Sequence, residues 1–219
     1  MKTKIKVHNR FDIELRDAET NELKVKGVAE NIVLDRMYTR LCSMNSYFTN
    51  IVFGSGTGTL DPTRTTLFNR IDSASASTVE TKNRVEPLYV TKRCILSPES
   101  YAGQTFTEVG ISETTTNINT HALIKDSEGN PLSITKTDLD VLTIYATVYV
   151  EISTDNSSFP MNNSVITYLL NGTTSISSGN ITVYRHSNSQ SKSVSLVADV
   201  PNKKTLFPKC VLGLVSLMV

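Results

Sequence analysis

Three glycines in five residues give the segment GSGTG, residues 54–58, the composition of a phosphate-binding loop. Such a loop follows an apolar strand and cradles an anion with its backbone, and GSGTG does follow the apolar run NIVF. A nucleotide-binding loop also needs a lysine and a Ser or Thr directly after its last glycine, whereas this chain continues TLDPTRTTLF. We therefore expect residues 54–58 to be a flexible or tightly turned structural connection.

Carboxylates offer a second possible chemistry. Asp138 and Asp140 stand two residues apart at the start of a strand-like run, and in a hydrolase such a pair shares acid and base catalysis. The same spacing also suits residues that cap a turn, which is the interpretation we favour. Glu108 lies among apolar residues in FTEVGIS, which indicates a buried structural carboxylate with a partner.

Histidines and cysteines are too scattered for metal or thiol chemistry. His8, His121 and His186 show no metal-ligand spacing. The three cysteines, Cys42, Cys94 and Cys210, are also far apart. Without a paired spacing they predict neither a disulfide framework nor a zinc site. They indicate free thiols in a reducing cytosol. No GxSxG motif is present. The sequence thus predicts no catalytic, cofactor-binding or metal residues, and a protein that is not an enzyme.

A sugar-binding site remains an alternative. Sugar platforms use exposed aromatic rings, and Tyr168 and Tyr184 lie in strand-like runs where they could serve, although packing on a sheet is the default interpretation. The basic pair Lys203-Lys204 indicates nothing beyond a loop. Glycosylation sequons occur by chance in a segment rich in Asn, Ser and Thr, at Asn156, Asn162, Asn171 and Asn180.

Composition limits the possible partners. The chain has 219 residues, a formal net charge of +1 and a pI near 7.7, which favour neither nucleic acid nor an acidic membrane surface. The positively charged start lacks the apolar core of a signal peptide, and the longest apolar runs are too short to span a bilayer. We therefore expect a soluble protein that folds in a reducing cytosol.

Hydrophobic periodicity predicts long strands and one helix. Residues 3–17 and 141–152 alternate apolar and polar side chains, which is typical of half-buried antiparallel strands. A helix is predicted over about 29–48, while the polar segment 73–83 is predicted to be a loop. The apolar stripe of this helix consists of Val33, Met37, Leu41, Met44 and Phe48.

The composition and the hydrophobic pattern of the sequence change near residue 153, where we place a domain boundary. Residues 1–152 are predicted to form an N-terminal β-rich module. Short β-like runs follow at intervals of about ten residues, so residues 153–219 are predicted to form a small β-sandwich or an added sheet. The predicted fold class is mainly β, with antiparallel β-sandwich-like sheets and one packed α-helix.

Five stretches over residues 9–150 form a set: NRFDIELRDAETNE, AENIVLDRMYTRL, IVFGSGTGTLDPTRTTLF, GQTFTEVGIS and HALIKDSEGNPLSITKTDLDVLTIYATVYV. Together they resemble a family of structural tail proteins from tailed phages and prophages of Gram-positive bacteria. The resemblance implies a virion component of a tail fibre or baseplate, without catalysis, that docks to the particle and forms a homo-oligomer, often a trimer, with other tail proteins as partners. A receptor- or glycan-binding module at the tail tip is the alternative.

Overall fold

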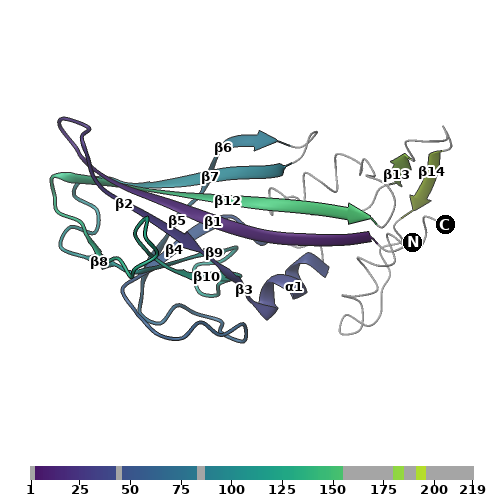
Figure 1. The fold of residues 1–219 in the computed structure, drawn as a ribbon, viewed down its shortest axis with the longest axis horizontal. Coiled ribbons are helices and arrows are strands. Elements are labelled where there is room, and N and C mark those ends of the chain that lie inside the picture. The colour runs from purple at the N-terminus through teal and green to yellow at the C-terminus, as the bar shows by residue number, and fades with distance from the viewer. Residues whose placement is uncertain (1–2, 43–45, 83–86, 155–179, 185–190, 196–219) are drawn as a thin grey trace.

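The structure is a computed structural model that describes residues 3–42, 46–82, 87–154, 180–184 and 191–195. Within these residues the chain forms fourteen strands and one helix (Figure 1). Most of the described chain is antiparallel β-sheet, so the predicted fold class is confirmed.

The first large sheet is built around the two longest strands. Strands β1 (Thr3–Asp17) and β12 (Asp140–Thr154) pair antiparallel along their whole length, with Thr3 opposite Thr154 and Asp17 opposite Asp140. Figure 1 shows them lying side by side. The full sheet has the order β2 (Leu23–Glu30), β1, β12, β7 (Leu88–Leu96) and β6 (Ser77–Lys82).

The second large sheet carries the most deeply buried strand. All five residues of β9 (Glu108–Ser112) are buried, because β9 lies between β10 and β4 and under the first sheet. The sheet order is β3 (Ile32–Val33), β10 (Thr120–Leu123), β9, β4 (Asn50–Gly54) and β5 (Arg70–Ser75). Two further pairs are β8 (Thr105–Phe106) with β11 (Ile134–Thr135), and β13 (Asn180–Tyr184) with β14 (Ser191–Ser195).

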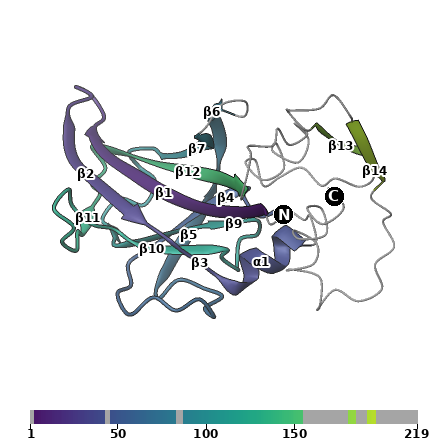
Figure 2. The same cartoon turned by 45° about the vertical axis from the view of Figure 1, so that its right-hand side comes forward.

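The chain crosses between the two large sheets at both of their edges. One residue, Asn31, separates β2 from β3, and one residue, Ala76, separates β5 from β6. At the first corner the side-chain Oδ1 of Asn31 accepts a hydrogen bond of 2.9 Å from the backbone N–H of Asn9, and at the second the N–H of Ala76 donates to the carbonyl oxygen of Thr49 at 2.9 Å. The sheets are therefore tied together along both sides, as the two layers in Figure 2 show.

The core fills the space between the sheets. Alternate residues of β1 point inward and are almost fully buried, at Phe11, Ile13 and Leu15. The inward row of β12 matches them, at Leu142, Ile144, Ala146, Val148 and Val150. The predicted alternation is thus confirmed on the inward face of both strands. On the outer face, Thr143 and Thr147 of β12 are nevertheless buried.

The helix is shorter than predicted. Strand β2 extends to Glu30, Ile32 and Val33 pair with β10, and α1 spans only Asp35–Cys42. The β-branched side chains of Ile32 and Val33 favour a strand, and pairing with a buried neighbour outweighs the helical spacing. The predicted stripe still packs inward, with Met37 and Phe48 buried, but its described residues come from a strand, the helix and the segment after it, and Met44 lies outside the described residues.

The predicted loop at 73–83 is also wrong. Its first residues complete β5, and its later residues form β6, which pairs with β7. The segment is too polar to show a strand pattern, and five of the six β6 residues are exposed. Backbone pairing with a neighbouring strand, rather than apolar burial, therefore makes this segment a strand.

Gly110 offers a test of how closely the strands of the second sheet approach one another. A Cβ atom at Gly110 would lie 2.4 Å from the backbone oxygen of Thr120 on β10, and backbone atoms cannot move aside cheaply. We expect Gly110→Ala to lower the free energy of unfolding by about 2 kcal/mol or more, as measured by urea denaturation. Ser127→Ala, at an exposed loop residue, is the control and should stay within about 0.5 kcal/mol of the wild type. Equal stability of the two variants would contradict the assigned strand packing.

Candidate functional site

The most unusual polar group in the described chain is the carboxylate of Glu108. It begins the buried strand β9 and its side chain is completely buried. Backbone N–H groups of Gly56, Phe68 and Asn69 donate to it at 2.9, 2.9 and 2.8 Å. Nε2 of His121, on the neighbouring strand β10, lies 2.8 Å from Oε2. A single side chain thus binds both ends of the loop between β4 and β5.

The glycine segment lies in this loop, and the structure gives its glycines a packing function. A Cβ atom at Gly56 would stand 2.3 Å from Cβ of Phe68 and 2.7 Å from Oε1 of Glu108. At Gly58 it would stand 2.7 Å from the Phe68 ring. Glycine is needed here because the backbone approaches Glu108 and Phe68 more closely than any side chain allows. The Gly56 N–H, which a phosphate would require, already donates to the protein's own carboxylate.

Two opposing effects act on the ionisation of Glu108. Burial alone would raise its pKa, because a charge is costly away from water. Hydrogen bonds from His121 and from the three backbone amides outweigh burial and hold the pKa of Glu108 below its ordinary value. An ionised carboxylate only accepts hydrogen bonds, so Nε2 of His121 carries the proton in this contact.

His121 is enclosed by aromatic packing on its other side. The ring of Phe68 lies 4.9 Å from the His121 ring, and the guanidinium of Arg64 lies 3.9 Å from the centre of the Phe68 ring. Nδ1 of His121 has no hydrogen-bond partner in the described structure. Glutamate and histidine form a pair that many active sites use, but here both side chains are fully buried. The arrangement as described holds a loop in place and offers no open face to a substrate.

The structure does not bring Asp138 and Asp140 into a common site. Asp138 is exposed, whereas Asp140 is buried and accepts from Nζ of Lys24 at 2.7 Å and from the N–H and Oγ1 of Thr137 at 2.8 and 2.6 Å. Burial opposes ionisation of Asp140, yet these hydrogen bonds keep its pKa below the ordinary value. Asp140 therefore caps the turn before β12, as the sequence indicated.

The remaining candidate residues are dispersed. His8 lies on the outer face of β1, and Cys94 is a buried free thiol whose pKa burial raises to about 12. Cys42 ends α1, and Asn180 and Tyr184 bound β13. In the described part of the chain, no three His, Cys, Asp or Glu side chains are grouped to hold a metal ion. Outside the described residues lie His186, Cys210, Tyr168, Lys203, Lys204, Asn156, Asn162 and Asn171.

A second charged cluster attaches the helix. Glu113, just after β9, pairs with the guanidinium groups of Arg36 and Arg40 on α1. Its other oxygen accepts from Nδ2 of Asn119 at 2.6 Å, and the same amide also donates to the carbonyl oxygen of Tyr47 at 2.7 Å. Like Glu108, this carboxylate joins segments that are distant in sequence.

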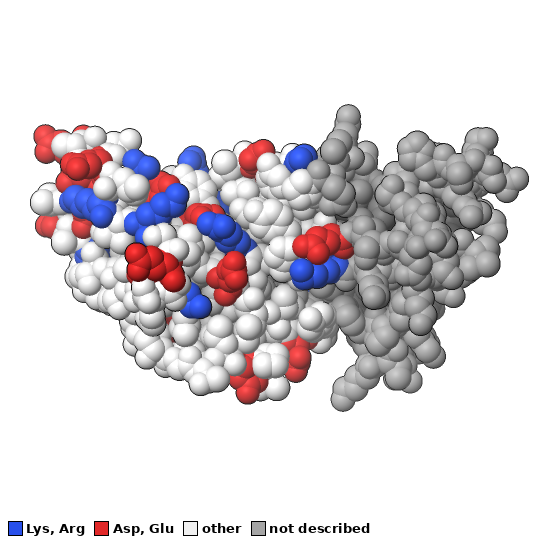
Figure 3. Space-filling view, in the orientation of Figure 1, with Lys and Arg blue, Asp and Glu red and all other residues white. Residues whose placement is uncertain are grey.

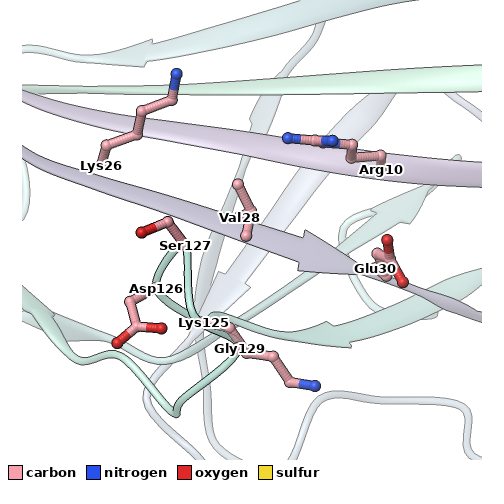
Figure 4. A pocket seen from close by; sticks show the side chains of 8 residues that line it. All are labelled: Arg10, Lys26, Val28, Glu30, Lys125, Asp126, Ser127 and Gly129. Atoms are coloured by element: carbon pink, nitrogen blue, oxygen red, sulfur yellow. The ribbon is translucent and has the colours of Figure 1, made fainter.

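A hollow of about 610 Å³ lies on the outer surface and was not predicted (Figure 4). Arg10 on β1, Lys26 and Glu30 on β2, and the loop at residues 125–129 form its walls. Its lining mixes both signs of charge, which suits a polar neighbour rather than a highly charged one. No sequence motif marked the hollow, since its residues come from three separate segments.

Comparison with protein families, with curated proteins and with solved structures gave no match to this chain. In the described residues, no helix is both long enough and apolar enough to cross a membrane.

Glu108→Gln tests whether the buried carboxylate supports the fold. The amide keeps the shape of the side chain but places an NH₂ group against N–H donors, so buried donors lose their acceptor. We expect a loss of about 2–4 kcal/mol in the free energy of unfolding, measured by urea denaturation at pH 7. Glu19→Gln, on an exposed turn, is the matched control and should change stability by less than about 0.5 kcal/mol.

The same variant yields a pH test. The pKa of Glu108 is lower in the folded chain than the ordinary 4.5. The ionised carboxylate therefore makes its full contribution to the free energy of unfolding above pH 4.5, and this contribution is lost as the pH falls through the pKa of the folded chain. The stability difference between the wild type and Glu108→Gln should therefore shrink when unfolding is measured from pH 7 down to pH 3. A difference that stays constant over this range would show that ionised Glu108 is not the stabilising form.

Proposed function

We propose that the chain is a structural component of a tailed-phage virion, in a tail fibre or baseplate, which docks to the particle and assembles as an oligomer. The proposal takes its class of protein from the motifs over residues 9–150, which resemble phage tail proteins. These motifs supply parts of both large sheets, including most of β1, the glycine loop, β9 and most of β12.

The observation that carries the proposal is how the buried charged groups are used. Glu108 binds the glycine loop, Asp140 caps the turn before β12, and Glu113 holds α1. Each of these carboxylates forms its hydrogen bonds or ion pairs within the chain, so all three support the fold, which is compatible with a building block of a larger assembly. The glycine loop within the resembling motifs then acts as a recurring structural connection.

The surface supports assembly through strands. Strand β6 pairs with β7 on one side only, and among the described residues no strand covers its other side. Its residues are mostly polar and exposed, and Val79 is 49% exposed at a bulge between Thr78 and Glu80. An open strand edge of this kind is a common means of contact between subunits.

The proposal is tested on particles. We expect mass spectrometry of density-purified virions from the bacterium that encodes the chain to detect it at several copies per particle, and immunogold electron microscopy to place the label on the tail. A host cytoplasmic protein is the control and should be lost on purification. Absence of the chain from intact particles would contradict the proposal.

A glycan array addresses the alternative of receptor binding by the C-terminal part. Structural assembly alone predicts no specific binding by the purified chain. Micromolar binding that disappears in Tyr168→Ala or Tyr184→Ala would instead favour a glycan-binding module, because stacking on a tyrosine ring is lost when the ring is removed.

A further inference from the structure

The outward side chains of the first sheet are aligned in rows across four strands. Backbone pairing places His8 of β1 opposite Tyr149 of β12, Tyr149 opposite Tyr89 of β7, and Tyr89 opposite Lys82 of β6. The rings of His8 and Tyr149 are stacked with centres 5.1 Å apart, and those of Tyr149 and Tyr89 are 5.9 Å apart. This row forms a rigid aromatic ridge, and tyrosine is a residue that interfaces favour.

The next row carries a basic residue on β1 and an acidic residue on β6, and Glu30 of β2 stands beyond the basic one. It runs from Arg10 of β1 through Thr147 and Thr91 to Glu80 of β6, and the two threonine hydroxyls lie 2.9 Å apart. Arg10 and Glu80 are both exposed. Each is also held in place: Arg10 donates to Asp12 at 2.9 Å, and the hydroxyl of Tyr89 donates to Glu80 at 2.6 Å. Arg10 is therefore the cation on the β1 side of this row, already paired with Asp12, and Glu80 forms a negative end on β6.

The third row carries an aromatic residue on one central strand and a basic residue on the other. Tyr145 of β12 lies opposite Arg93 of β7, between Asp12 on β1 and Ser77 on β6. A ring on one central strand thus faces the position of a guanidinium on the other, and an arginine stacked on a tyrosine ring is a favourable pair.

A two-fold rotation pairs most positions of these rows with complementary ones, and it also sets His8 opposite Lys82 of the second copy. A two-fold axis parallel to the strands, between β7 and β12, places β12 of one copy over β7 of the other and β1 over β6. In that arrangement Arg10 faces Glu80 of a second copy, and Tyr149 faces Tyr89 of a second copy. Tyr145 likewise faces Arg93 of a second copy. The middle row thus pairs opposite charges, the first row pairs two tyrosine rings, and the third row pairs a tyrosine ring with a guanidinium. Such an interface is isologous and forms each contact twice.

We propose that this outer face, formed by the three rows on β1, β12, β7 and β6, binds a second copy of the chain in a two-fold, face-to-face dimer. The inference deepens the proposed function and rests on it for the expectation that the chain assembles with itself. Acidic and basic side chains are interspersed on the side of the molecule drawn in Figure 3. A mixed surface suits a copy of itself better than a partner of uniform charge.

Charge reversal tests the proposal, with sedimentation velocity of the purified full-length chain as the measurement. The wild type should dimerise. Arg10→Glu and Glu80→Arg should each weaken dimerisation at least about tenfold, because each change creates two repulsive contacts per dimer. Mixing the two single variants should restore a dimer, since both contacts of the mixed pair again join one acidic side chain to one basic side chain.

Lys26→Glu is the matched control, because Lys26 is an exposed cation on β2 of the same sheet but has no counterpart strand beyond β6. It should leave dimerisation unchanged, and all variants should keep the wild-type circular dichroism spectrum. A monomeric wild type, or variants that do not recover on mixing, would overturn the proposed dimer. The result is separable from the proposed function, since a dimer with these properties stands even if the chain is absent from virions, and detection in virions stands even if the dimer fails.

Discussion

The buried carboxylate of Glu108 satisfies a requirement that the rest of the fold creates. The loop between β4 and β5 returns over the second sheet without forming a strand, so its inward N–H groups have no ladder partner. A carboxylate has two oxygens that accept several bonds at once, and Glu108 serves three backbone amides and one imidazole. An apolar side chain would fill the same space but would leave these donors buried and unsatisfied.

Fixing this loop also fixes how the sheets are joined. The loop leads directly into β5, which crosses at Ala76 into β6 and so enters the first sheet. At the opposite edge β2 crosses at Asn31 into β3. Between these corners, the long pairing of β1 with β12 joins segments that are far apart in sequence. The order of the strands thus depends on contacts between segments that are distant in sequence. The loop between β4 and β5, which Glu108 binds, helps to hold these strands in register.

The sequence predicted the features that have a strong local pattern. The alternation at Phe11, Ile13 and Leu15 identified a strand, because these inward positions are apolar and the positions between them are polar, although the inward Asn9 departs from the pattern. The predicted start of the helix was wrong, because the spacing of Val33 and Met37 fits a helix although Val33 belongs to a strand. The apolar surroundings of Glu108 indicated burial, but its backbone partners lie 39 to 52 residues earlier in the chain, beyond any local pattern.

The outer face illustrates a further limit of sequence patterns. Alternation at β1 shows that His8 and Arg10 point outward, but only the register with β12, β7 and β6 shows which side chains stand beside them. Shifting one strand by two residues would keep every residue on its face, yet it would separate Tyr149 from His8 and Tyr89. The pairing of β1 with β12 is continuous over fifteen residues, whereas β6 carries a bulge next to Glu80. The position of the negative end of the face is therefore set by that bulge, and the surface chemistry depends on the same non-local register as the core.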